Sequence, residues 1–154
     1  MRLLPVATPL KGMRAKLIRT GIRIRGARGH PEVRAAFVRF ARWLRHEYQL
    51  PIRVPVYLFA SEQIITMHGD RVSASFFAPY DRREEPFIRI ATGDYTQLRK
   101  ELGRDNALAS LLHSFAHELV HYQQWVATGE LSERGVVLRA RNIVDRYAAS
   151  TDRP

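Results

Sequence analysis

The sequence of 154 residues contains no cysteine, which excludes disulfide bonds and any metal site with thiolate ligands. It also lacks any apolar run close to the roughly 18 residues that a membrane-spanning helix needs. The first ten residues are too short a stretch, and too interrupted by proline, for the apolar part of a secretory signal. We therefore expect a cytoplasmic protein without a membrane partner, in which a metal would be bound by histidine and carboxylate side chains.

Acidic residues are absent from residues 1–30, which carry eight lysine or arginine residues. All 15 acidic residues of the chain come later, so most of the net charge of +10 belongs to this first segment. We interpret residues 1–30 as a basic N-terminal arm, with a short helix near Met13–Ile18 and a strand near Ile22–Arg25. Such an arm can bind nucleic acid or another polyanion. A solvated, partly packed extension is the alternative.

Residues 31–154 are interpreted as one domain, since their length suits a single hydrophobic core. Pro31 to about Tyr48 is predicted to be a helix, because apolar residues recur on one face: Val33, Phe37, Phe40, Leu44 and Tyr48. Apolar and β-branched runs then predict strands at 54–60, 63–68, 71–77 and 86–91, with a hairpin at Gly69-Asp70. Four short strands in succession favour a small, mainly antiparallel sheet and therefore an α+β fold.

Two helices and their connection are expected to complete the domain. A small helix is predicted from Asp94 to Leu102, and a long one begins near Asp105 or Asn106. Gly129 is a suitable residue to end the long helix. Ser132 can cap a last helix from about Glu133 to Ala149, antiparallel to the long one.

The long helix contains His117-Glu118-Leu119-Val120-His121, an H-E-x-x-H pattern. Residues four apart lie on one face of a helix, so His117 and His121 can direct two imidazoles at one ion. In this pattern the two histidines bind one Zn²⁺ ion, and Glu118 is the general base for a zinc-activated water. An ordinary packed helix is the alternative, but chance matches seldom fall in the middle of an apolar helix.

The motif resembles the zincin superfamily of metallopeptidases, and the run from His117 to Gln124 resembles small zincin-like proteins of bacteria and phages. The resemblance implies a twisted sheet packed on the motif helix, with an edge strand that takes an extended peptide above the metal. Pro86–Ala91 is the candidate for that edge, and an internal strand is the alternative. In the glutamate zincins, the helix after the motif helix supplies a third ligand.

Three carboxylates are candidates for the third ligand, namely Glu133, Glu130 and Asp145. Glu133 is preferred because it opens the expected last helix and resembles the acidic stretch of the related proteins. That placement requires the motif helix to end soon after Gln124. If the turn is instead centred on Gly129, Asp145 would face the motif helix further along, and Glu130 could bind the metal from the loop.

The predicted function is therefore a zinc metallopeptidase that hydrolyses peptide or protein substrates. Two other classes of function stay open. One is a catalytically inactive, structural zincin-fold protein, and the other is a nucleic-acid-binding protein that acts through its basic arm. Zinc content separates the first alternative from the enzyme, and salt-dependent binding to DNA would support the second.

Overall fold

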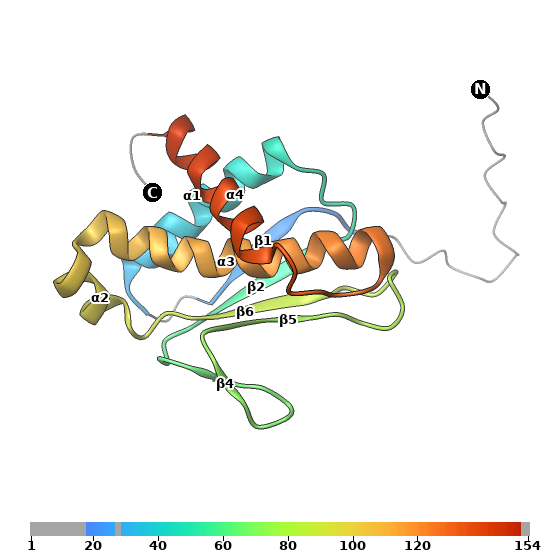
Figure 1. The fold of residues 1–154 in the computed structure, drawn as a ribbon, viewed down its shortest axis with the longest axis horizontal. Helices are drawn as coiled ribbons and strands as arrows, with labels where there is room; N and C mark the ends of the chain where they lie inside the picture. The colour runs from blue at the N-terminus through green and yellow to red at the C-terminus, as the bar shows by residue number, and fades with distance from the viewer. Residues whose placement is uncertain (1–17, 27–28, 152–154) are drawn as a thin grey trace, which may run out of the picture.

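The computed structural model describes residues 18–26 and 29–151, which contain four helices and six strands (Figure 1). In chain order they are β1 (Ile22–Arg25), α1 (Pro31–Glu47), β2 (Val54–Phe59), β3 (Ile64–Ile65), β4 (Arg71–Val72), β5 (Ala74–Phe77), β6 (Phe87–Ala91), α2 (Tyr95–Leu102), α3 (Arg104–Thr128) and α4 (Val136–Ser150). The α+β class is as expected. The helix expected near Met13–Ile18 falls, except for Ile18, outside the described residues. Among those described, no helix has both the length and the apolar character to cross a membrane.

The main sheet is mixed, so the expectation of a mainly antiparallel sheet is wrong. Its strand order is β1-β2-β6-β5, in which β1 and β6 both run parallel to β2, and β5 runs antiparallel to β6. The sequence-based expectation treats consecutive strands as neighbours. Here α1 connects β1 to β2, and a helical crossover of this kind returns the chain so that the two strands are parallel. Part of the basic N-terminal segment thus belongs to the sheet, with Ile22 buried at its inner face.

The hairpin expected at Gly69-Asp70 is present but short, because β3 and β4 pair over two residues each. After Ser73 the chain leaves this hairpin, and Ala74–Phe77 pairs instead with β6. Strand β6, the candidate for the sheet edge, therefore lies between β2 and β5 and is internal. The edge of the sheet on this side is β5.

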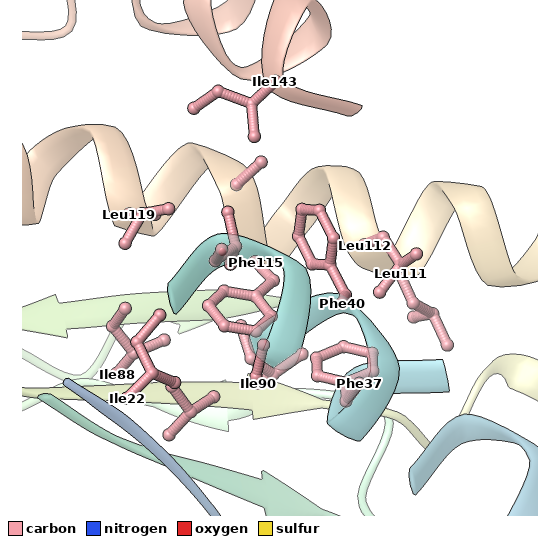
Figure 2. Close-up of a cluster of buried hydrophobic side chains, with 14 of the residues drawn as sticks. Ile22, Phe37, Phe40, Ile88, Ile90, Leu111, Leu112, Phe115, Leu119 and Ile143 are labelled. Carbon is pink, nitrogen blue, oxygen red and sulfur yellow. The ribbon is translucent and has the colours of Figure 1, made fainter. Parts of the chain in front are cut away.

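The helices α1, α3 and α4 lie on one side of the main sheet (Figure 1). The core lies between α3, α1 and the inner face of the sheet, as Figure 2 shows for Phe37, Phe115 and Ile88. The rings of Phe37 and Phe115 stack with their centroids 5.4 Å apart. Helix α3 is buried along most of its length, since it packs against the sheet on one side and α4 on the other. Its position in the molecule is therefore fixed by the core.

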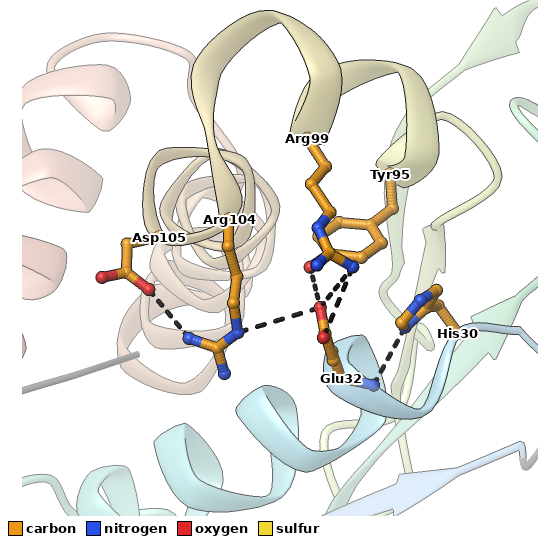
Figure 3. A network of polar contacts seen from close by, with 6 residues as sticks. All are labelled: His30, Glu32, Tyr95, Arg99, Arg104 and Asp105. Carbon is orange, nitrogen blue, oxygen red and sulfur yellow. Dashed lines mark hydrogen bonds and ion pairs between the residues drawn. The ribbon is translucent and has the colours of Figure 1, made fainter.

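A polar network fixes the corner where α2 meets α3 (Figure 3). The Glu32 carboxylate at the start of α1 accepts a hydrogen bond from the Tyr95 hydroxyl and pairs with Arg99 at 3.4 Å and Arg104 at 3.8 Å. The Tyr95 hydrogen bond holds the pKa of Glu32 below its usual value. Burial, followed by the contact with Glu32, raises the pKa of Tyr95 to about 12. The network joins the first turn of α1 to both helices.

Helix α3 ends as the sequence predicts, with Gly129 in the left-handed region at φ 80°. Helix α4 begins at Val136, three residues later than expected, and is preceded by Gly135 at φ 73°. Ser132 does not cap it, because its Oγ accepts a hydrogen bond from the Arg134 N–H, at 3.1 Å, within the loop. Residues 129–135, here called the return segment, are all exposed.

Candidate metal centre

Helix α3 presents the H-E-x-x-H residues at the boundary between core and solvent. Glu118 and His121 are buried, with 8% and 6% of their surface exposed, whereas the His117 side chain is 25% exposed. The two histidine rings lie on successive turns with centroids 5.2 Å apart. The packing of Leu119 and Val120 into the core determines which face of the helix these rings occupy. The pair is thus held rigidly, with one side open to solvent.

Glu133 of the return segment completes a group of three possible ligands. Its carboxylate oxygens lie 3.2 Å from His117 Nε2 and 2.8 Å from His121 Nε2. All three donor atoms fall within 4.8 Å of one another, so the group could hold a metal ion. The Glu133 side chain is 76% exposed, and this leaves the group accessible to water and to a substrate.

The path of the return segment explains how Glu133 reaches the histidines. After Gly129 the chain runs back along α3, where the Thr128 hydroxyl accepts a hydrogen bond from the Glu130 N–H at 3.1 Å. One turn earlier on α3, Gln124 bonds to Ser132. The requirement that the motif helix end near Gln124 is therefore wrong, because an extended segment, rather than the first turn of α4, carries Glu133. This segment runs antiparallel to α3, which is the course that was expected for the last helix.

Gln124 connects one histidine to the return segment. Its amide Oε1 accepts a hydrogen bond from the Ser132 N–H at 3.1 Å, and its Nε2 donates to the Ser132 carbonyl at 2.9 Å. These two backbone contacts determine which end of the amide is oxygen. The same Oε1 lies 3.0 Å from His121 Nδ1, which must then carry the proton and donate.

The contact between His121 and Glu133 indicates whether these residues suit a metal ion. With its proton on Nδ1, a neutral His121 has only a lone pair at Nε2, yet a carboxylate oxygen of Glu133 lies 2.8 Å from that atom. Two acceptor atoms this close need a positive charge between them, which either a second proton on the imidazole or a bound metal ion supplies. Ligands at about 2.0–2.2 Å from a tetrahedral zinc ion lie about 3.3–3.6 Å apart. The Glu133 oxygens lie 3.2 Å and 2.8 Å from the two imidazole nitrogens, somewhat closer than that spacing. The donor set of two imidazoles and a carboxylate therefore fits Zn²⁺.

The pKa shifts of His117 and Glu118 suit metal binding and proton transfer respectively. Burial lowers the pKa of His117, so its imidazole is neutral over a wider pH range, and neutral imidazole is the form that binds metal. Burial likewise raises the pKa of Glu118 to about 7, with a smaller opposing effect of His121. A carboxylate with a pKa near neutrality can both accept and donate a proton at physiological pH.

A cavity of about 310 Å³ lies beside the group. Its walls come from three elements: β5 contributes Ala74, Ser75 and Phe76, α3 contributes Glu118 and His121, and the return segment contributes Leu131, Ser132 and Glu133. The sheet edge, the buried Glu118 and two of the three donor residues, His121 and Glu133, thus line one space. The sequence did not indicate that β5 would line this cavity, because residues 71–77 were predicted to be one strand of a local hairpin.

The other two candidate ligands lie elsewhere. Glu130 lines a separate cavity with Thr128 and Arg139, and Asp145 is an exposed residue of α4. Neither belongs to the single group of His and carboxylate donors found in the described part of the chain. Gln124, in contrast, is a site residue that the sequence analysis missed. Its position three residues after His121, on the same helical face, was the available signal.

We expect Gln124→Ala to lower zinc affinity about 10- to 100-fold, as is usual for residues that orient a metal ligand. The substitution removes the acceptor for His121 Nδ1–H and both hydrogen bonds to Ser132. Gln123→Ala is the matched control, because Gln123 bonds to Arg139 and has no contact with the three donors among its hydrogen bonds. Competition with a zinc-binding dye measures both affinities. Equal affinities for the two variants would contradict this role of Gln124.

Comparison of this chain with models of known protein families, with curated proteins and with solved structures gave no match. What it does must therefore be inferred from the geometry of the site.

Proposed function

We propose that this protein is a zinc-dependent metallopeptidase of the zincin type. The observation that supports the proposal is the group of His117, His121 and Glu133, the last two of which line a cavity together with Glu118. Two imidazoles and one carboxylate, with an open fourth position, are the ligands of many catalytic zinc sites. When bound, the ion would supply Lewis-acid polarisation of a carbonyl group and would lower the pKa of water.

Glu118 is the general base in this proposal. Its carboxylate is buried in the cavity wall and has a pKa of about 7, so it can take a proton from the attacking water. It can then deliver that proton to the nitrogen of the leaving amine. The cavity wall keeps bulk water from the carboxylate, and this is also the cause of its raised pKa.

The free edge of β5 would bind the substrate. Its backbone groups on the side away from β6 have no strand partner in the main sheet, and Ala74 to Phe76 line the cavity. An extended peptide can add to such an edge as a further strand, which places a backbone carbonyl near the metal group. The substrates are therefore peptides or unfolded protein segments.

Metal removal tests the proposal. We expect the purified protein to contain about one zinc ion per chain and to cleave a denatured protein substrate. Dialysis against a zinc chelator should abolish cleavage, and added Zn²⁺ should restore it. Mass spectrometry of the metal content and of the cleavage products gives both readings. A protein that purifies without zinc and binds none on titration would instead be a structural member of the fold.

A further inference from the structure

The face of the main sheet that points away from the helices carries aromatic and arginine side chains. Tyr57, Phe59 and Phe77 are 40%, 40% and 42% exposed, and Arg23 and Arg25 are also exposed. The β3–β4 hairpin lies on this side of the sheet (Figure 1), and these side chains nevertheless stay partly exposed. Most proteins cover large aromatic side chains or disperse them, so a group of exposed rings on one sheet face is a candidate binding surface.

The strand register orders these side chains in rows across the sheet. Arg25 pairs with Tyr57, Tyr57 pairs with Arg89, and Arg89 pairs with Ser75. The row therefore places one aromatic residue between two arginines. The Arg89 side chain is held in this row by a hydrogen bond from its Nε to Ser75 Oγ at 3.1 Å.

A second set of rings adjoins this row. Phe87 contacts Tyr57 edge-on at a centroid distance of 6.0 Å, and Phe77 stacks on Phe87 at 4.8 Å. Phe59 follows Tyr57 by two residues on β2 and thus lies on the same face. The rings of Tyr57, Phe87 and Phe77 form a continuous aromatic surface across β2, β6 and β5, and Phe59 lies beyond Tyr57 on the same face. We call it, together with Arg23, Arg25 and Arg89, the basic aromatic face.

The charged residues of the strands that form this face have one sign. The four strands of the main sheet contain three arginines and no acidic residue. A partner that complements the face must therefore combine negative charge at regular intervals with flat groups that stack on rings. Residues 1–17 of this chain cannot supply that complement, since their sequence carries four basic residues and no acidic one.

We propose that the basic aromatic face binds single-stranded nucleic acid. Unpaired bases stack on exposed aromatic side chains irrespective of their sequence, and arginine side chains beside the rings bind the phosphates. Base pairs of a duplex are stacked on each other and cannot reach the rings, so a duplex would bind only through the charges. The surface lies on the opposite side of the sheet from the helix that carries the metal centre, and its binding does not need zinc.

The test is fluorescence anisotropy with a labelled single strand of about 15 thymidines, compared with a duplex of the same length, in a buffer that contains a zinc chelator. Tyr57→Thr with Phe59→Thr keeps residues that suit a strand but removes two rings. We expect this variant to bind the single strand about tenfold more weakly or worse, and Tyr57→Phe, which keeps the ring, to bind within about twofold of the original chain.

Charge is tested with a matched pair of variants. Arg23→Gln with Arg25→Gln removes two charges from the face, and Arg34→Gln with Arg42→Gln removes two from the exposed side of α1. The first should reduce the salt dependence of single-strand binding by about 1.4 in log–log slope, since each phosphate contact contributes about 0.7. The second should leave that slope close to its original value.

Three results would overturn the proposal. They are equal affinity for duplex and single strand, unchanged affinity after removal of both rings, and equal losses in the two arginine variants. The last would assign binding to overall charge or to the N-terminal segment. Thermal unfolding of every variant shows whether it is folded, and if the ring variant is not, the two arginine variants decide the matter.

Discussion

Glu118→Gln is expected to lower the rate of peptide hydrolysis at least about 10²- to 10⁴-fold, the usual contribution of a general base. Glutamine has nearly the shape of glutamate but cannot accept a proton. Glu118 does not belong to the group of three donors, so zinc should remain bound at one ion per chain. Hydrolysis of a denatured protein substrate and the zinc content of the same preparation give the two readings.

Glu130→Gln is the control for this substitution, because Glu130 is exposed and lines a different cavity. It should hydrolyse the substrate at the original rate. Turnover close to the original rate in Glu118→Gln would show that this carboxylate is not the base, even if the protein proves to be a zinc peptidase. Loss of zinc from Glu118→Gln would show instead that the buried carboxylate holds the site together.

Glu133→Ala is expected to lower zinc affinity by more than about 100-fold, which is the upper range for residues that only support a ligand. The two histidines alone offer two donors, whereas catalytic zinc sites in proteins use three. The side chain is largely exposed, so its removal should leave the free energy of unfolding of the zinc-free protein nearly unchanged. Zinc titration and urea unfolding measure the two quantities separately.

Two further carboxylate variants make the comparison specific. Glu130→Ala and Asp145→Ala each remove one negative charge at an exposed position, and neither residue is near enough to His117 or His121 to join the group. Both should bind zinc with the affinity of the original chain. If Asp145→Ala loses the metal and Glu133→Ala keeps it, the third ligand comes from α4 and the assignment of Glu133 is wrong.

The sequence predicted the parts of this site that depend on helical spacing. His117 and His121 lie on one face because four residues make about one turn, and this holds for any helix. Gly129 ends α3 because glycine takes the left-handed conformation at low cost. These are local rules, and the structure agrees with them.

The position of Glu133 depends on contacts that local rules do not contain. The course of the return segment is determined by two hydrogen bonds between the Gln124 amide and the Ser132 backbone, with an eight-residue separation. Patterns of apolar residues carry no information about such bonds. Glu133 was preferred because it opens the expected last helix and resembles the acidic stretch of zincin-like proteins, and the helix geometry assumed for it was different from the one observed.

The pairing of the strands could also not be predicted from the sequence. The strands β1, β2 and β6 are rich in apolar and β-branched residues, which predicts strands but not their neighbours. Their parallel pairing follows from the crossover through α1 and from the departure of the chain from the short hairpin at Ser73. The same departure places β5 at the edge of the sheet and beside the cavity. The wrong strand pairing is therefore also the reason why Pro86–Ala91, rather than β5, was expected to be the edge strand.

The return segment contributes the third donor but little to the core, since all of its residues are exposed. The core therefore constrains the helix of the two histidines far more strongly than the segment that carries Glu133. Substitutions there can tune or abolish metal affinity at little cost to the stability of the domain. Variants of this chain that differ only in these seven residues should therefore keep the fold, and the surface proposed on the opposite side of the sheet, whether or not they keep the group of metal-binding donors.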